Sequence, residues 1–371
     1  MLIGASIKMS ILRSRKLLAG GLCLVLLSAC STVGLGDVPQ NRENYNKALD
    51  SSENEQFLMN VVRMHYGENP YFVGVDSITA ATSLTAGVRG TFGVNNVWAP
   101  INGVQWSGSP QIAFSQTPTI TYSPVQGGKF ATGMLAPLTL DKIYLLLQSG
   151  YNVKEVLKLT TTRIGNLSNG RSSHYVASTS VPNTSDFDNF INTLDDLVDT
   201  NQVTTEFTSY ESQPAVFLYA TTEYGAKTLA QGLKLSKPYQ KLIFANTLVI
   251  DKSQPENVIS ISTRSFFNVM AFLSNNVDTP AVDRTESENY NATLVDSSLD
   301  WSKYTSNMLH VRESSSEPSD AVAQVEYDSH WYYIQDNDDL SKSTLVLLKL
   351  IYSLQSGDVQ ANLPLITIPI N

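Results

Sequence analysis

A stretch of 39 residues without a single charge, between Arg89 and Lys129, constrains the fold of this chain more than any other feature. Apolar and polar residues alternate within it, as around Ile112 and Phe114, and glycines and prolines interrupt the pattern. Alternation with a period of two is typical of β-strands, because successive side chains point to opposite faces. We therefore expect a low-charge β-hairpin over about residues 82–125.

Two interpretations of this hairpin differ in what covers it. In the simpler one, a hairpin with a glycine-rich tip packs on its own domain. In the other, Trp98 and Trp106 lie at a contact with lipid or with neighbouring subunits, and they are the candidate partner-contact residues. One hairpin cannot cross a bilayer alone, because its edges would leave backbone groups unpaired. Crossing would therefore need a ring of subunits.

The first 29 residues have the pattern of a secretory signal. Their apolar run, residues 17–27, is too short to span a bilayer, which takes about 20 residues. Met9 lies just before most of the charges, so translation starting at Met1 and translation starting at Met9 both fit. The charges before residue 30 are all positive: Lys8, Arg13, Arg15 and Lys16.

The segment Leu27-Ser28-Ala29-Cys30 resembles the lipobox of bacterial lipoproteins. The resemblance implies cleavage before Cys30, a diacylglycerol on its sulfur and an acyl chain on its new amine. Two or more chains anchor a protein stably, whereas one does not. In the alternative, an ordinary signal peptide, Cys30 is a coincidence. Ser31, rather than Asp, follows the cysteine, which in lipoproteins of double-membrane bacteria favours the outer membrane.

Removing this segment changes the composition of the chain. Cys23 is removed with it, so the lipidated Cys30 would be the remaining cysteine, which excludes disulfides, thiol catalysis and cysteine metal sites. The 25 basic residues fall to 21 against 34 acidic ones. A nucleic-acid partner is excluded, since it would require a basic face.

The mature chain is expected to hold a lipidated tether over residues 30–43 and one integrated α+β unit over residues 44–371. Its sheet should be mixed and mostly antiparallel, with packed helices, because helical and strand patterns alternate without a strict βαβ rhythm. Residues 153–167 are ambiguous. Helices are expected at 44–65, 127–135, 139–148, 186–199, 222–234, 265–274 and 336–355. Strands are expected at 203–210, 215–220, 242–250, 259–263, 365–370, and as a pair at 308–313 and 322–327 that 331–334 extends.

No motif indicates catalysis, so no catalytic, cofactor-binding or metal residue is assigned, and no cofactor is expected. The four histidines (His65, His174, His310 and His330) are far apart in sequence. The acidic group at 336–339 has two interpretations, a Ca²⁺ site or the charged start of a helix. The aromatic group at 327–333 similarly has two, a binding platform or core packing.

Several segments resemble a group of poorly characterised proteobacterial outer-membrane lipoproteins. They are Glu55–Arg63 with Tyr66-Gly67 and Asn69–Phe72, then Pro118–Pro124, Trp331–Asp336 with Leu340–Thr344, and Pro364–Pro369. The resemblance covers nearly the whole mature chain and implies one integrated α+β unit. It supplies no catalytic residue.

These patterns together predict a non-enzymatic outer-membrane lipoprotein facing the periplasm, with surface exposure left open. It would be a structural or accessory part of an envelope assembly for transport, secretion or maintenance. The partners expected are the membrane, through the lipid on Cys30, and either other proteins or further copies of the chain. The alternatives are a periplasmic hydrolase acting on envelope polymers and a lipoprotein that binds a small ligand.

Overall fold

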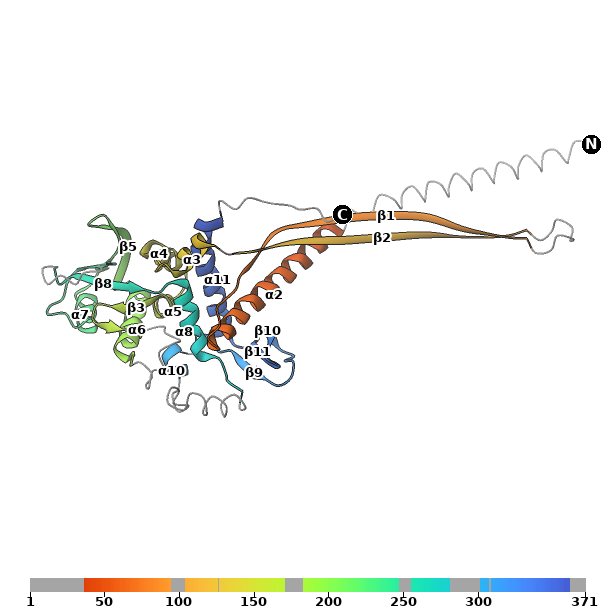
Figure 1. Ribbon diagram of the computed structural model, residues 1–371. Coiled ribbons are helices and arrows are strands. Elements are labelled where there is room, and N and C mark those ends of the chain that lie inside the picture. Colours follow the sequence, from red (N-terminus) through yellow and green to blue (C-terminus); the bar gives the residue numbers. More distant parts are fainter. Residues whose placement is uncertain are drawn as a thin grey trace, which may run out of the picture. The chain divides into compact units, whose positions relative to one another are not determined.

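A computed structural model places the backbone of most of the chain (Figure 1). It divides into two compact units, each assembled from segments that the other interrupts. The expectation of one integrated unit over residues 44–371 stays a prediction. The described residues are 37–94, 104–125, 127–170, 183–246, 255–280, 301–306 and 308–360. Unit 1 takes Met1–Gly67, Ser173–Thr184 and Met270–Lys349, and unit 2 takes Glu68–Ser172, Ser185–Val269 and Leu350–Asn371.

Unit 1 contains the long helix α2 (Asp37–His65). Leu58, Val61 and Val62 are all fully buried on it, at the spacing of one helix face. The helix predicted over 44–65 is therefore confirmed, with an earlier start. The other helical elements of unit 1 are η1 (Ser274–Asn276), α10 (Trp301–Thr305) and the first part of α11 (Asp339–Gln360).

The small sheet of unit 1 differs from the prediction. Its three described strands, β9 (Arg312–Ser314), β10 (Ala321–Tyr327) and β11 (His330–Gln335), are antiparallel in the order β10-β11-β9. The expected pairing of 308–313 with 322–327 is wrong, because β9 pairs with β11. The chain reverses at Asp328 and Ser329, whose φ angles of 48° and 65° suit a two-residue hairpin turn, so β11 is a strand of its own.

Unit 2 contains a mixed sheet of six described strands in the order β4-β3-β8-β7-β6-β5. Only the β7–β8 pair is parallel among the pairs described in this sheet. The predicted α+β class, with a mostly antiparallel sheet and packed helices, is confirmed. The strands are β3 (Thr161–Ile164), β4 (Leu167–Ser168), β5 (Val203–Tyr210), β6 (Gln213–Ala220), β7 (Lys241–Ala245) and β8 (Val258–Thr263).

The helices of unit 2 follow the hydrophobic periodicity closely. In α6 (Ser185–Asp199) the buried residues are the five whose spacing predicted a helix there. The ambiguous segment 153–167 is a helix that passes directly into strands β3 and β4. The other helices are α3 (Gly128–Leu135), α4 (Leu140–Gln148), α5 (Val153–Thr160), α7 (Glu223–Gly232) and α8 (Phe266–Leu273), whose last residues belong to unit 1.

The predicted hairpin is confirmed as a pair of long strands, β1 (Val73–Val94) and β2 (Val104–Pro124). Figure 1 shows them side by side along their length. Strand β1 begins nine residues earlier than the predicted boundary at 82. The strand expected over 365–370 lies outside the described residues, as does the end of the one expected over 242–250.

Candidate functional site

Three residues were singled out from the sequence, and one of them lies on a described element. Trp106 is part of β2, where its backbone pairs with that of Phe92. Trp98 and Cys30 lie outside the described residues, so their predicted roles stay predictions. Because Trp106 lies on β2, the hairpin formed by β1 and β2 is the first candidate site.

The two strands of the hairpin form an antiparallel ladder with one irregularity. The ladder runs from Val73 paired with Pro124 to Val94 paired with Val104. The register shifts between Val75 and Ser77, where Asp76 is an additional residue in β1. One additional residue is a β-bulge, and it changes which positions of β1 share a face with β2.

Above the bulge, every second pair along the ladder lies on the same face, because the side-chain period of a strand is two. On one face, called here the apolar face, the positions between residues 84 and 94 and between 104 and 114 hold aliphatic, aromatic, glycine or proline residues. Its pairs are Leu84/Phe114, Ala86/Ile112, Val88/Pro110, Gly90/Gly108, Phe92/Trp106 and Val94/Val104.

The opposite face of the same segment, called here the polar face, holds small and polar residue types. Arg89 is the one charged residue between positions 84 and 94, and it falls on this face. The ladder therefore separates residue types strictly, which is the pattern of a strand with two different surroundings. The pairs of the polar face are Thr85/Ala113, Gly87/Gln111, Arg89/Ser109, Thr91/Ser107 and Gly93/Gln105.

The apolar face has a defined lower limit. Thr82 paired with Gln116 interrupts it just below Leu84. Nearer the base, the side chains of Val75, Ile120 and Tyr122 are 41%, 38% and 56% exposed. Apolar side chains at the foot of the hairpin, below the apolar face, are thus open to their surroundings.

The foot of the hairpin is fixed in the core of unit 2 by Phe72, whose side chain is buried. The ring of Phe72 stacks on Tyr352 of α11 with centroids 4.8 Å apart, and its centroid lies 5.8 Å from that of Phe266 and 6.3 Å from that of Phe130. The N–H of Val125 donates to the carbonyl of Phe72 at 3.0 Å, which closes the ladder. This aromatic cluster anchors the base of the hairpin. The pattern around Phe72 gave no sign of it, because single aromatic residues lack periodicity.

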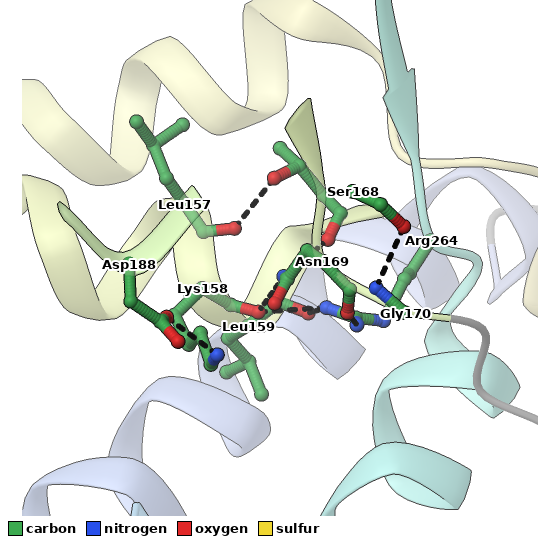
Figure 2. A network of polar contacts seen from close by, with 9 residues as sticks. Leu157, Lys158, Leu159, Ser168, Asn169, Gly170, Asp188 and Arg264 are labelled. Carbon is green, nitrogen blue, oxygen red and sulfur yellow. Dashed lines mark hydrogen bonds and ion pairs between the residues drawn. The ribbon is translucent and has the colours of Figure 1, made fainter. Parts of the chain in front are cut away.

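A second candidate site is a group of buried polar side chains where α5 meets β3 (Figure 2). Arg264 is fully buried. Its Nη1 donates to the carbonyls of Lys158 at 2.7 Å and Leu159 at 3.1 Å, and its Nη2 donates to that of Asn169 at 3.0 Å. The Nδ2 of Asn169 donates to the carbonyls of Lys158 and Thr161. The contacts with Lys158, Leu159 and Thr161 satisfy carbonyls at the C-terminal end of α5, where the helix itself supplies no donors.

Lys158 extends this group towards α6. Its Nζ is 2.6 Å from Oδ1 of Asp188, and its side chain is 2% exposed. Burial lowers the pKa of Lys158 below its ordinary value, and the hydrogen bond and the charge of Asp188 partly offset that effect. The group joins α5, α6, β4 and the end of β8, so we assign it to the stability of unit 2. The sequence gives no signal for it, since arginine and lysine are mostly surface residues.

The described histidines are spread over separate contacts in unit 1. His65 is half-buried and hydrogen-bonded, with Nδ1 2.9 Å from the carbonyl of Ser274. His310 Nε2 lies 3.0 Å from Asp278 Oδ1, and His330 Nδ1 lies 2.8 Å from Glu313 Oε1. Among the described residues no group of three or more metal-ligating side chains converges.

The aromatic group at 327–333 and the acidic group at 336–339 each have two interpretations from the sequence. Their contacts bear on both. In the aromatic group, Tyr332 is 1% exposed and its hydroxyl lies 2.5 Å from that of Tyr66, which also stacks on Tyr327. This supports core packing. In the acidic group, the carboxylate of Asp338 accepts from the N–H and the hydroxyl of Ser341, which is the geometry of a helix N-terminus.

No helix in the described part of the chain is long and apolar enough to cross a membrane. Comparisons with protein-family models, curated proteins and solved structures find no match for this chain.

Proposed function

We propose that this chain is a non-enzymatic lipoprotein of the outer membrane, and that it acts as a structural or accessory component of an envelope assembly through its hairpin. The observation that carries the proposal is the two-faced ladder of β1 and β2, together with the exposed apolar side chains of Val75, Ile120 and Tyr122 at its foot. An apolar face on an extended hairpin, with exposed apolar side chains at its foot, supports a contact with a partner or with lipid.

The location rests on the sequence before residue 31. The lipobox ending in Cys30 and the following Ser31 support a lipid anchor in the outer membrane, facing the periplasm. Replacing the acyl-bearing residue tests this directly. In a Cys30→Ser variant that also lacks residues 93–108, we expect the protein to leave the outer-membrane fraction, whereas the same deletion with Cys30 intact should stay in it. A variant that stayed in that fraction would show that another part of the chain holds it there.

The contact role of the hairpin is tested by shortening it. Deleting residues 93–108 removes Trp98 and Trp106 and leaves Gly90–Phe92 as a loop between the paired Arg89 and Ser109. We expect crosslinking in intact cells to capture partners with the full chain and to lose them with this variant. Ser51→Ala on the exposed surface of α2 is a matched control that should keep them. Equal capture by all three proteins would contradict the proposal.

A periplasmic hydrolase is the second candidate, and one observation favours it. The His310–Asp278 pair is partly exposed, with side-chain exposures of 31% and 47%, and such a pair can serve as a general base with its orienting carboxylate. Incubating the purified protein with envelope polymers tests this role. Product release that His310→Gln abolishes would favour the hydrolase over the structural component.

A further inference from the structure

We propose that copies of this chain pair hairpin to hairpin into a closed ring, and that the segment 84–94 with 104–114 lies in the hydrocarbon layer of a membrane. In this arrangement lipid acyl chains cover the apolar face, and the polar face encloses water. The inference rests on the envelope location proposed above, and it names what the hairpin contacts there.

The length of the apolar face fits a bilayer. The segment from Leu84 to Val94 has 11 residues, and so does its partner from Val104 to Phe114. A membrane-crossing strand needs about 9–11 residues. At about 3.4 Å a residue the segment is about 34 Å long, and a tilt of about 40° gives a height close to the ~25 Å apolar band of such strands. The Thr82/Gln116 pair then marks the lower border of the hydrocarbon.

The distribution of residue types between the faces fits lipid on one side and water on the other. Strands that cross membranes alternate between apolar residues towards lipid and polar residues towards the interior. Here Arg89 falls on the polar face, between pairs formed by threonine, serine, glutamine and glycine. The apolar face holds no charge between its ends. This arrangement places no charged residue against the hydrocarbon. With the faces reversed, Arg89 would face lipid, which is energetically costly.

The outer edges of the hairpin require further copies. Among the described strands, β1 and β2 pair only with each other. Backbone groups cannot stay unpaired in hydrocarbon, so each outer edge needs another strand. Setting β1 of one copy beside β2 of the next keeps every pair antiparallel and lets the ring close. Pro110, Pro118 and Pro124 remove three N–H donors from β2, and Pro110 is the one of them that lies within the segment 104–114.

In a competing arrangement, two hairpins pack their apolar faces together in water. The scarcity of charged residues along the strands argues against it. Strands with exposed edges in water are usually protected by charged side chains, which prevent uncontrolled pairing. The 22 positions of 84–94 and 104–114 hold one charge, Arg89. Of the features that protect strand edges, this segment has Pro110 but almost no charged side chains, so away from that proline its outer edges are open to pairing with neighbouring copies.

A cysteine scan of the hairpin tests the proposal with the full, mature lipoprotein. Cys30 is the one native cysteine after residue 29, and its sulfur carries lipid in the proposed form, so an introduced thiol can be labelled selectively. Single cysteines are placed at each position from Leu84 to Val94 and labelled with an environment-sensitive fluorophore. The proteins are then reconstituted into phosphatidylethanolamine–phosphatidylglycerol vesicles. We expect quenching by doxyl-labelled lipid at even positions and by aqueous iodide at odd positions.

Two adjacent substitutions provide the matched control. Ile112→Lys puts a charge on the apolar face, and Ala113→Lys puts the same charge on the polar face. We expect the first to reduce the vesicle-inserted fraction by about tenfold or more and the second to leave it nearly unchanged. Circular dichroism checks that both variants fold. Crosslinking in the vesicles should give a ladder ending at one fixed number of copies, and Ile112→Lys should shorten it.

Two results would overturn the inference. Iodide quenching at every position would show a hairpin in water, and protection from both quenchers at even positions would show an apolar face covered by protein. Either result would leave the proposed function intact, because membrane fractionation of Cys30→Ser and partner capture test that separately. Conversely, an alternating pattern without any captured partner protein would support the ring and contradict an accessory role towards other proteins.

Discussion

The ring of Tyr352 stacks on the ring of Phe72, with 4.8 Å between centroids and 23° between planes. Phe72 immediately precedes β1, and Tyr352 lies in the C-terminal part of α11. Residues 280 positions apart thus fix the base of the hairpin within unit 2.

Truncating the buried member of this pair should destabilise unit 2 strongly. We expect Phe72→Ala to lower the free energy of unfolding by about 3–5 kcal/mol, because it leaves a cavity among three aromatic rings. Urea unfolding followed by fluorescence measures the loss. Tyr71→Ala is the adjacent control, and since Tyr71 is 44% exposed it should cost less than about 1 kcal/mol. Equal losses would contradict the assigned role of Phe72.

Two aspartates in the first turn of α6 should differ in their contribution to stability. Asp188 pairs with the buried Lys158, and Asp186 pairs with the exposed Lys234, both at 2.6 Å. Asp188→Asn should cost about 2–4 kcal/mol, because it leaves a buried ammonium without its counter-charge. Asp186→Asn should cost less than about 1 kcal/mol. Similar shifts in the two urea midpoints would show that burial of Lys158 does not matter.

The stability of unit 1 should depend on pH through His65. Burial lowers the pKa of His65 below 6.5, and its bond to the Ser274 carbonyl and the charge of Asp278 offset this in part. Between the folded pKa and 6.5 the unfolded chain therefore binds the extra proton. The stabilising effect is complete above pH 6.5 and is lost as the pH falls through the folded pKa. Urea titrations from pH 7.5 to 5 should show this slope, and His65→Asn should reduce it.

Shortening the hairpin should leave the rest of unit 2 intact. The residues between 93 and 108 that lie on described strands pair only across the hairpin itself. We therefore expect the variant that lacks residues 93–108 to unfold within about 0.5 kcal/mol of the full chain. Differential scanning calorimetry checks this. A large loss of stability would mean that the partner-capture experiment reports misfolding instead of a lost contact.

The sequence patterns predicted local structure well where a periodic apolar face existed. Phe187, Phe190 and Leu194 recur at helical spacing, and all three are buried in α6. The pairing partners of strands were harder to predict, because β9 finds β11 through contacts that no local pattern specifies. The contacts of Arg264 were inaccessible for a similar reason, since its carbonyl acceptors come from residues about 100 positions away.

The sequence predicted that a hairpin is present. It did not predict which residues of the two strands pair with each other. The absence of charge and the period-two alternation indicated the hairpin, but the pairing of Phe92 with Trp106 depends on where the two strands meet. The bulge at Asp76 decides that. A bulge needs one additional residue, and composition gives little indication of its place.

That bulge has a consequence for how the hairpin can change in length. With a side-chain period of two, inserting one residue above Ser77 would reverse the faces of everything beyond it. Insertions of two residues in each strand preserve both faces and lengthen the hairpin by about 7 Å. The hairpin can therefore lengthen in even steps without exchanging its two faces, and the irregular ladder beside Asp76 offers a place that can accommodate a single-residue change.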